Sequence, residues 1–188
     1  MSKNKKETSE AITLRRHSRQ AAKLGFAFIA IYIVSILIYT AWKLLTRDAL
    51  TERWAVAAIA LGANTILWIF SDKKGFAPLY YRGIIFLLMC MYLAVATFSI
   101  YTERGMASNS IILYAIPLVI ASLTYSARAI FATAALASIT YSAAAISYFR
   151  HFPSEGYKVE LYGQLVFYSA ILFLIAGLLW ILMRSKKA

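Results

Sequence analysis

Residues 110–126 read SIILYAIPLVIASLTYS, and residues 129–148 read AIFATAALASITYSAAAISY. Only Ala127 and Arg128 separate these two apolar runs, and so short a connection predicts two antiparallel neighbouring helices. Small residues recur at every fourth position of the second run: Ala134, Ser138 and Ser142. This spacing predicts a shared helix-packing face that lets another backbone approach closely. We predict that the hairpin is the packing centre of an all-α, polytopic membrane helical bundle.

The composition is that of a membrane protein. Apolar residues make up 61% of the chain and charged residues 15%, with a mean hydropathy of +0.66, whereas a soluble domain is about half apolar and a quarter charged. Runs of about 20 apolar residues are long enough to cross the hydrocarbon core. Six runs predict six transmembrane helices, at residues 25–45, 54–70, 83–101, 110–126, 129–149 and 161–183. They form one membrane domain, 25–183, between a basic cytoplasmic N-terminal segment, 1–24, and a basic cytoplasmic tail, 184–188.

The positive charge is distributed as a membrane topology requires. The net charge is +12, and the basic residues flank apolar runs, which favours contact with membrane lipids over binding of nucleic acid. With the N-terminus inside, the cytoplasmic segments hold 14 of the 20 Lys and Arg residues and the other side holds six. Because cytoplasmic loops carry the excess of Lys and Arg, we predict a multi-pass plasma-membrane protein with both termini in the cytoplasm. Residues 11–24 have a helical spacing of basic side chains, which predicts a helix lying on the membrane surface.

Residues that carry catalytic chemistry are scarce. No Asp, Glu, Lys, Arg or His lies deep inside a predicted span, which argues against a proton-coupled pump. The sequence has no His-Glu-x-x-His arrangement and no Gly-x-Ser-x-Gly motif. One cysteine, Cys90, cannot form an intramolecular disulfide, and with two histidines it makes no metal-ligand cluster. We therefore expect a protein that is not an enzyme and has no catalytic residue, metal or cofactor.

Four residues inside the predicted spans are candidates for ligand contact: Asn64, Thr65, Pro117 and Gln164. A buried Asn in a membrane helix is costly unless it pairs with another helix. Hydrogen bonding between helices is therefore the simpler interpretation of Asn64, and ligand contact is the alternative. Pro117 is predicted to kink the fourth span because it removes a backbone hydrogen bond.

Residues 102–149 have a recognisable pattern. A turn with glycine (ERGMASNS) leads to a helix with a central Ile116-Pro117 pair, and a small, basic turn at residues 126–128 precedes an Ala-rich helix. This pattern resembles the six-span membrane input domain of bacterial sensor histidine kinases, without the kinase core. The resemblance implies a non-enzymatic sensory or regulatory module that acts through a signalling protein partner or through self-association.

Two other classes of function remain open. One is a small transporter or permease component for a neutral or apolar solute, with Asn64, Thr65 and Gln164 along its path. The other is a lipid-modifying enzyme, for which the polar candidates are loop residues: Glu103, Arg104, His151 and Glu155.

Overall fold

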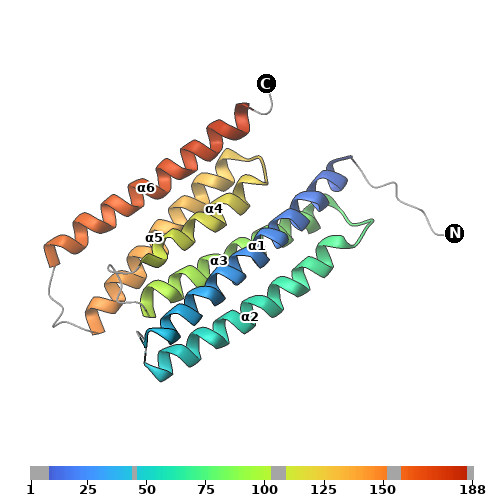
Figure 1. The fold of residues 1–188 in the computed structure, drawn as a ribbon. Helices are drawn as coiled ribbons and strands as arrows, with labels where there is room; N and C mark the ends of the chain where they lie inside the picture. The colour runs from blue at the N-terminus through green and yellow to red at the C-terminus, as the bar shows by residue number, and fades with distance from the viewer. Residues whose placement is uncertain (1–8, 44–45, 103–108, 152–157, 186–188) are drawn as a thin grey trace. The chain divides into compact units, whose positions relative to one another are not determined.

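The computed structural model describes residues 9–43, 46–102, 109–151 and 158–185, which are helical apart from short connections. The helices are α1 (Ser9–Ala41), α2 (Arg47–Asp72), α3 (Pro78–Thr102), η2 (Asn109–Tyr114), α4 (Ala115–Ser122), α5 (Ala127–His151) and α6 (Lys158–Ser185), and η2 is a 3-10 helix (Figure 1). The all-α fold class is confirmed for the described part of the chain.

Five of these helices are long and apolar enough to cross a membrane: α1, α2, α3, α5 and α6. The protein is therefore a multi-pass helical membrane protein by helix length and hydropathy. The predicted fourth span differs from the others, because its apolar helix runs only from Ser110 to Ser122. Six full-length spans are thus not confirmed.

Pro117 accounts for the short fourth helix. Proline has no backbone N–H, and inside an α-helix its ring clashes with the carbonyl four residues earlier. Here α4 begins at Ala115, so Pro117 lies in the first turn, where a backbone N–H has no partner within the helix anyway. The preceding residues wind as the 3-10 helix η2. Instead of the predicted kink, the structure has a change of helix type between Tyr114 and Ala115.

The chain forms two compact units, residues 1–88 and 89–188, and the boundary falls within α3. In the first unit, α1 and α2 pack along each other as a hairpin (Figure 1). One face of α2 is buried, and its residues follow the helical period: Arg53, Ala57, Ala60, Asn64 and Ser71. Mostly small residues on this face allow the close approach that helix packing in a membrane requires.

Residues 9–24 of the basic N-terminal segment are part of α1. The sequence predicts that residues 11–24 lie on the membrane surface, but they continue directly into the first span. One face of this part is buried, at Ala11, Leu14, Ser18 and Ala21. The described residues of this part therefore begin a helix that continues into a membrane-length span, and they are not the separate surface helix that the sequence predicted.

In the second unit, α5 packs against α4 and α6. Its buried face consists of residues three or four apart: Ile130, Thr133, Ala134, Ala137, Tyr141, Ala144, Ala145 and Tyr148. Of the predicted packing residues, Ala134 is buried, whereas Ser138 and Ser142 are half-buried. A row of residues four apart turns by about 40° per step around a helix of 3.6 residues per turn, so the predicted row leaves the packing face.

The turn between α4 and α5 lies four residues earlier than predicted. It comprises residues 123–126, and Ala127 and Arg128 are already helical. Tyr125 adopts a positive φ of 53° in this turn. The Ser126 hydroxyl then accepts a hydrogen bond from the Ala129 N–H at 3.4 Å, which is the contact that an N-cap residue makes. As predicted, the short connection joins two helices that pack side by side.

Candidate functional site

Asn64 joins the two helices of the first unit. It is fully buried, and its side-chain amide donates to the Ala22 carbonyl of α1 at 3.0 Å. The neighbouring Thr65 hydroxyl donates to the Leu61 carbonyl of its own helix at 2.7 Å. Asn64 therefore joins α1 to α2 by a hydrogen bond, the simpler of the two interpretations that the sequence offered. Thr65 makes its hydrogen bond within α2.

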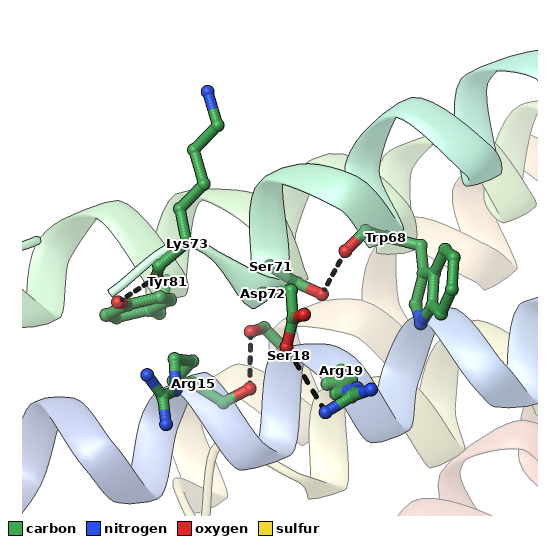
Figure 2. A network of polar contacts seen from close by, with 8 residues as sticks. All are labelled: Arg15, Ser18, Arg19, Trp68, Ser71, Asp72, Lys73 and Tyr81. Atoms are coloured by element: carbon green, nitrogen blue, oxygen red, sulfur yellow. Dashed lines mark hydrogen bonds and ion pairs between the residues drawn. The ribbon is translucent and has the colours of Figure 1, made fainter. Parts of the chain in front are cut away.

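A polar network covers the end of the first unit where α1 starts and α2 ends (Figure 2). Arg19 forms an ion pair with Asp72 at 3.2 Å, and Arg82 of α3 forms one with Glu10 at 2.6 Å. Seven basic residues belong to this end, and we call them the basic cap: Arg15, Arg16, Arg19, Lys23, Lys73, Lys74 and Arg82. The ion pairs join α1 to the end of α2 and to the start of α3.

Hydroxyl groups complete the end of α2. The Tyr81 hydroxyl donates to the Lys73 carbonyl at 2.7 Å, and the Tyr80 hydroxyl donates to the Phe70 carbonyl at 3.3 Å. The buried Ser71 hydroxyl donates to the Trp68 carbonyl at 2.7 Å (Figure 2). The last carbonyls of a helix have no partner within it, so Tyr81 supplies a donor to the Lys73 carbonyl. Tyr80 adds a second donor to the Phe70 carbonyl, which also accepts from the Lys73 N–H, and both tyrosines hold the start of α3 against the end of α2.

Arg53 is a buried cation that the sequence analysis missed. The predicted second span starts at Trp54, but α2 begins at Arg47, so Arg53 lies inside the helix and is fully buried. Its guanidinium lies over the Tyr39 ring, 5.1 Å from the centroid. Arg53 directly precedes the predicted second span, so the expectation that no ionisable residue lies deep inside a predicted span is not affected. Burying an arginine in a membrane protein costs free energy, and such residues are often functional. No pattern in the sequence predicts that Arg53 lies over the Tyr39 ring.

The second unit contains a buried hydroxyl network at the junction of η2 and α4. The hydroxyl oxygen of Tyr114 lies 2.9 Å from the Thr97 hydroxyl of α3. Thr97 donates its own proton to the Leu93 carbonyl at 2.7 Å, so Tyr114 supplies the proton between them. Tyr114 is fully buried. The Tyr114–Thr97 hydrogen bond thus connects α3 to the point where η2 gives way to α4.

Three aromatic rings extend this network across the unit. Tyr114 meets Tyr141 of α5 edge to face, with 6.3 Å between ring centroids, and Tyr141 meets Tyr168 of α6 in the same way at 5.8 Å. Edge-to-face pairs at such distances are favourable. The row of tyrosines therefore connects η2, α5 and α6.

Unused hydrogen-bonding capacity lies on α5 and α6. Within the described residues, three buried polar atoms of these helices have no hydrogen-bond partner: the Ser138 hydroxyl, the Tyr141 hydroxyl and the Gln164 side-chain oxygen. Tyr141 and Ser138 are three residues apart, and Gln164 lies one turn before Tyr168, on the same side of α6. Among the sequence candidates, Gln164 thus has a side-chain acceptor without a partner in the described residues, whereas Pro117 is buried in α4 and has an apolar side chain.

Of the residues proposed for a lipid-modifying enzyme, His151 lies in the described part of the chain. His151 ends α5, where its ring meets Tyr101 at 6.5 Å and its Nδ1 lies 3.0 Å from the Ser147 carbonyl. Glu103, Arg104 and Glu155 lie outside the described residues. No group of three His, Cys, Asp or Glu residues that would hold a metal occurs in the described ranges.

Comparisons with protein-family models, curated proteins and solved structures gave no match for this chain. The described residues support a multi-span helical membrane protein with five long apolar helices.

Proposed function

We propose that the protein is a non-enzymatic sensory or regulatory membrane module whose moving part is the η2–α4 segment. One observation carries the proposal: the helix type changes between Tyr114 and Ala115, where the Tyr114 hydroxyl is bonded to Thr97. A 3-10 helix of six residues is unusually long, and such stretches often mark a hinge.

The geometry of the two helix types suggests how the segment responds. A 3-10 helix rises about 2.0 Å per residue and an α-helix about 1.5 Å. Conversion of η2 to an α-helix would shorten it by about 3 Å and rotate its residues relative to α4. A stimulus that binds one form better than the other shifts the population between them. The Tyr114–Thr97 hydrogen bond favours the form with the 3-10 helix.

We further propose that η2–α4 is a sixth membrane crossing. Six residues at about 2.0 Å and eight at about 1.5 Å give about 24 Å, close to the hydrocarbon core of about 30 Å. The contact between Tyr114 and Tyr141, near the middle of α5, supports a segment that runs along much of α5. Six crossings bring both termini to the cytoplasmic side of the plasma membrane, in agreement with the distribution of Lys and Arg.

A small transporter for a neutral solute is the second candidate. It is favoured by the buried polar atoms of Ser138, Tyr141 and Gln164, which have no partner in the described residues. Unpaired polar groups inside a membrane protein are costly. A neutral solute with both donors and acceptors would satisfy them.

The experiment that separates the two candidates starts with cross-linking in the native membrane. The protein and its Tyr114→Phe and Tyr162→Phe variants are then purified in mild detergent, and co-purifying proteins are identified by mass spectrometry. Tyr162 is the control because it lies exposed on α6. A signalling partner whose phosphorylation changes in Tyr114→Phe but not in Tyr162→Phe supports the sensory module. Solute flux in reconstituted vesicles that Gln164→Leu abolishes, with no signalling partner, would contradict it.

A further inference from the structure

Two polar contacts join α1 and α2 near the two ends of their hairpin. Arg19 pairs with Asp72 at 3.2 Å (Figure 2), and the Arg53 guanidinium lies 5.1 Å from the centroid of the Tyr39 ring. Arg19 and Tyr39 are 20 residues apart on α1, and Arg53 and Asp72 are 19 residues apart on α2. At about 1.5 Å per residue, the two contacts are separated by about 30 Å along α1 and about 29 Å along α2. The hydrocarbon core of a bilayer has the same thickness, about 30 Å.

The exposed surface of the hairpin between the two contacts is apolar. Residues 24–42 and 54–71 contain no Asp, Glu, Lys, Arg or His. The large exposed side chains there are Leu24, Ile31, Val34, Leu37, Ile38, Trp42, Trp54, Ile59, Leu61, Ile66, Ile69 and Phe70. From residue 13 to residue 23, the exposed side chains of α1 are polar or charged: Thr13, Arg16, Arg19, Gln20 and Lys23. Because helix side chains lean toward the N-terminus, the Lys23 ammonium can reach the level of Arg19.

The ends of the helices limit where the bilayer can lie. α1 ends at Ala41, and the exposed Lys43 after it has a positive φ of 53°. α2 ends at Asp72, and the exposed residues 73–77 after it are not helical. Irregular backbone that faces lipid does not occur in the hydrocarbon core, because its N–H and C=O groups would lack partners. The core therefore ends no later than Ala41 at one side and Asp72 at the other, and a first span that reaches residue 45 does not fit.

We propose that the bilayer surrounds the first unit between these two contacts, so that residues 9–18 of α1 stand in water beyond it. Lipid acyl chains cover the apolar surface, and the headgroups begin at the levels of the two contacts. The exposed Trp42 and Trp54 lie near the Arg53–Tyr39 level, where tryptophans of membrane proteins are enriched. Arg53 then lies at the boundary of the core, where a cation costs less than at the bilayer centre.

The part of α1 beyond the bilayer carries an ion pair of its own. Residues 9–18 extend about 15 Å past the Arg19–Asp72 contact. There Glu10 pairs with Arg82 of α3 at 2.6 Å, and both side chains are more than half exposed. Exposed charges are costly in hydrocarbon, so this ion pair fits a position in water. This placement of the bilayer is independent of the sensory mechanism, since neither η2 nor α4 belongs to the first unit.

The test measures the depth of spin labels on the full chain in dioleoylphosphatidylcholine vesicles. In a Cys90→Ser background, single cysteines for labelling are introduced as Thr13→Cys, Ile31→Cys, Ile38→Cys, Ile59→Cys and Ile66→Cys. All five positions are exposed, so no label replaces a buried side chain. Depth is obtained from collisions of the label with oxygen, which concentrates in hydrocarbon, and with a nickel chelate, which stays in water.

We expect the label at residue 31 to lie about 10 Å deeper than the label at residue 38, because Ile38 is next to Tyr39 and Ile31 is eight residues before it. The labels at residues 59 and 66 have equal depth, since each position is six residues inside one of the two contacts. The label at residue 13 collides freely with the nickel chelate.

Three results would each overturn the proposal. In the first, the label at residue 38 lies as deep as the label at residue 31, which places the centre of the first span nearer the turn. In the second, the depths at residues 59 and 66 differ by more than about 5 Å, the rise of one helical turn. In the third, the label at residue 13 is shielded from the nickel chelate, so that the start of α1 is in the bilayer.

Discussion

At the scale of single residues, polar side chains inside the apolar runs differ in their hydrogen-bond partners, although the sequence does not distinguish them. Asn64 crosses to another helix, whereas the adjacent Thr65 bonds within its own turn. The Tyr114 hydroxyl bonds to Thr97 of α3, whereas Tyr141 makes ring contacts and its hydroxyl has no hydrogen-bond partner among the described residues. Sequence reasoning selected Asn64 and Gln164 because amides in apolar runs are rare. It missed Arg53 and Tyr114, because burial beside a distant aromatic or hydroxyl leaves no local pattern.

Asn64→Ala is expected to destabilise the protein by about 1–2 kcal/mol, because it removes the hydrogen bond to Ala22 and leaves a small cavity between α1 and α2. Thr65→Ala is the control and is expected to change stability by less than about 0.5 kcal/mol, since its hydroxyl bonds within α2. Thermal unfolding in detergent measures both. Equal destabilisation by the two variants would show that Asn64 does not join the helices.

Tyr114→Phe is expected to cost about 0.6–1 kcal/mol, the usual range for one hydrogen bond between membrane helices. The phenyl ring keeps the contact with Tyr141, and Thr97 still donates to Leu93. Tyr162→Phe, at an exposed position, is expected to have no effect. Unfolding by titration with a denaturing detergent compares the two. An unchanged midpoint in Tyr114→Phe would mean that the hydroxyl does not hold the junction.

At the scale of elements, hydropathy located the helices well and their ends poorly. The long apolar runs correspond to α1, α2, α3, α5 and α6. Periodicity does not distinguish a 3-10 helix from an α-helix over a few residues, so η2 was not predicted. The position of Pro117 was informative, but a proline inside a run is compatible with a kink or with a helix start. Ser126 offered an N-cap signal for α5 that the apolar pattern concealed.

Pro117→Ala is expected to let the α-helix extend back into η2, because alanine restores the backbone N–H and removes the ring clash. Spin labels at Ser110 and Ser122 should then move about 3 Å closer, measured by double electron–electron resonance. Val119→Ala, also in α4, is the control that leaves this distance unchanged. A distance that stays the same in Pro117→Ala would show that proline does not maintain the 3-10 helix.

At the scale of the whole molecule, composition was enough to identify a multi-pass membrane protein. The pairing of residues far apart in sequence was not accessible, as the ion pair of Glu10 with Arg82 illustrates, because nothing local relates them. The number of crossings depends on η2–α4, whose apolar helix, Ser110–Ser122, is shorter than the other five. The described residues divide into two units within α3, a division that no composition change in the sequence marks.

The count of membrane crossings is the central claim, and the sidedness of the two termini tests it most directly. In a Cys90→Ser background, a single cysteine is placed at Thr13 or at Ser185, both exposed positions of the described chain. Each variant is treated with a membrane-impermeant maleimide in intact cells and in inverted vesicles. Six crossings predict that both cysteines react only in inverted vesicles. Reaction of the two cysteines on opposite sides would mean five crossings and would contradict η2–α4 as a membrane span.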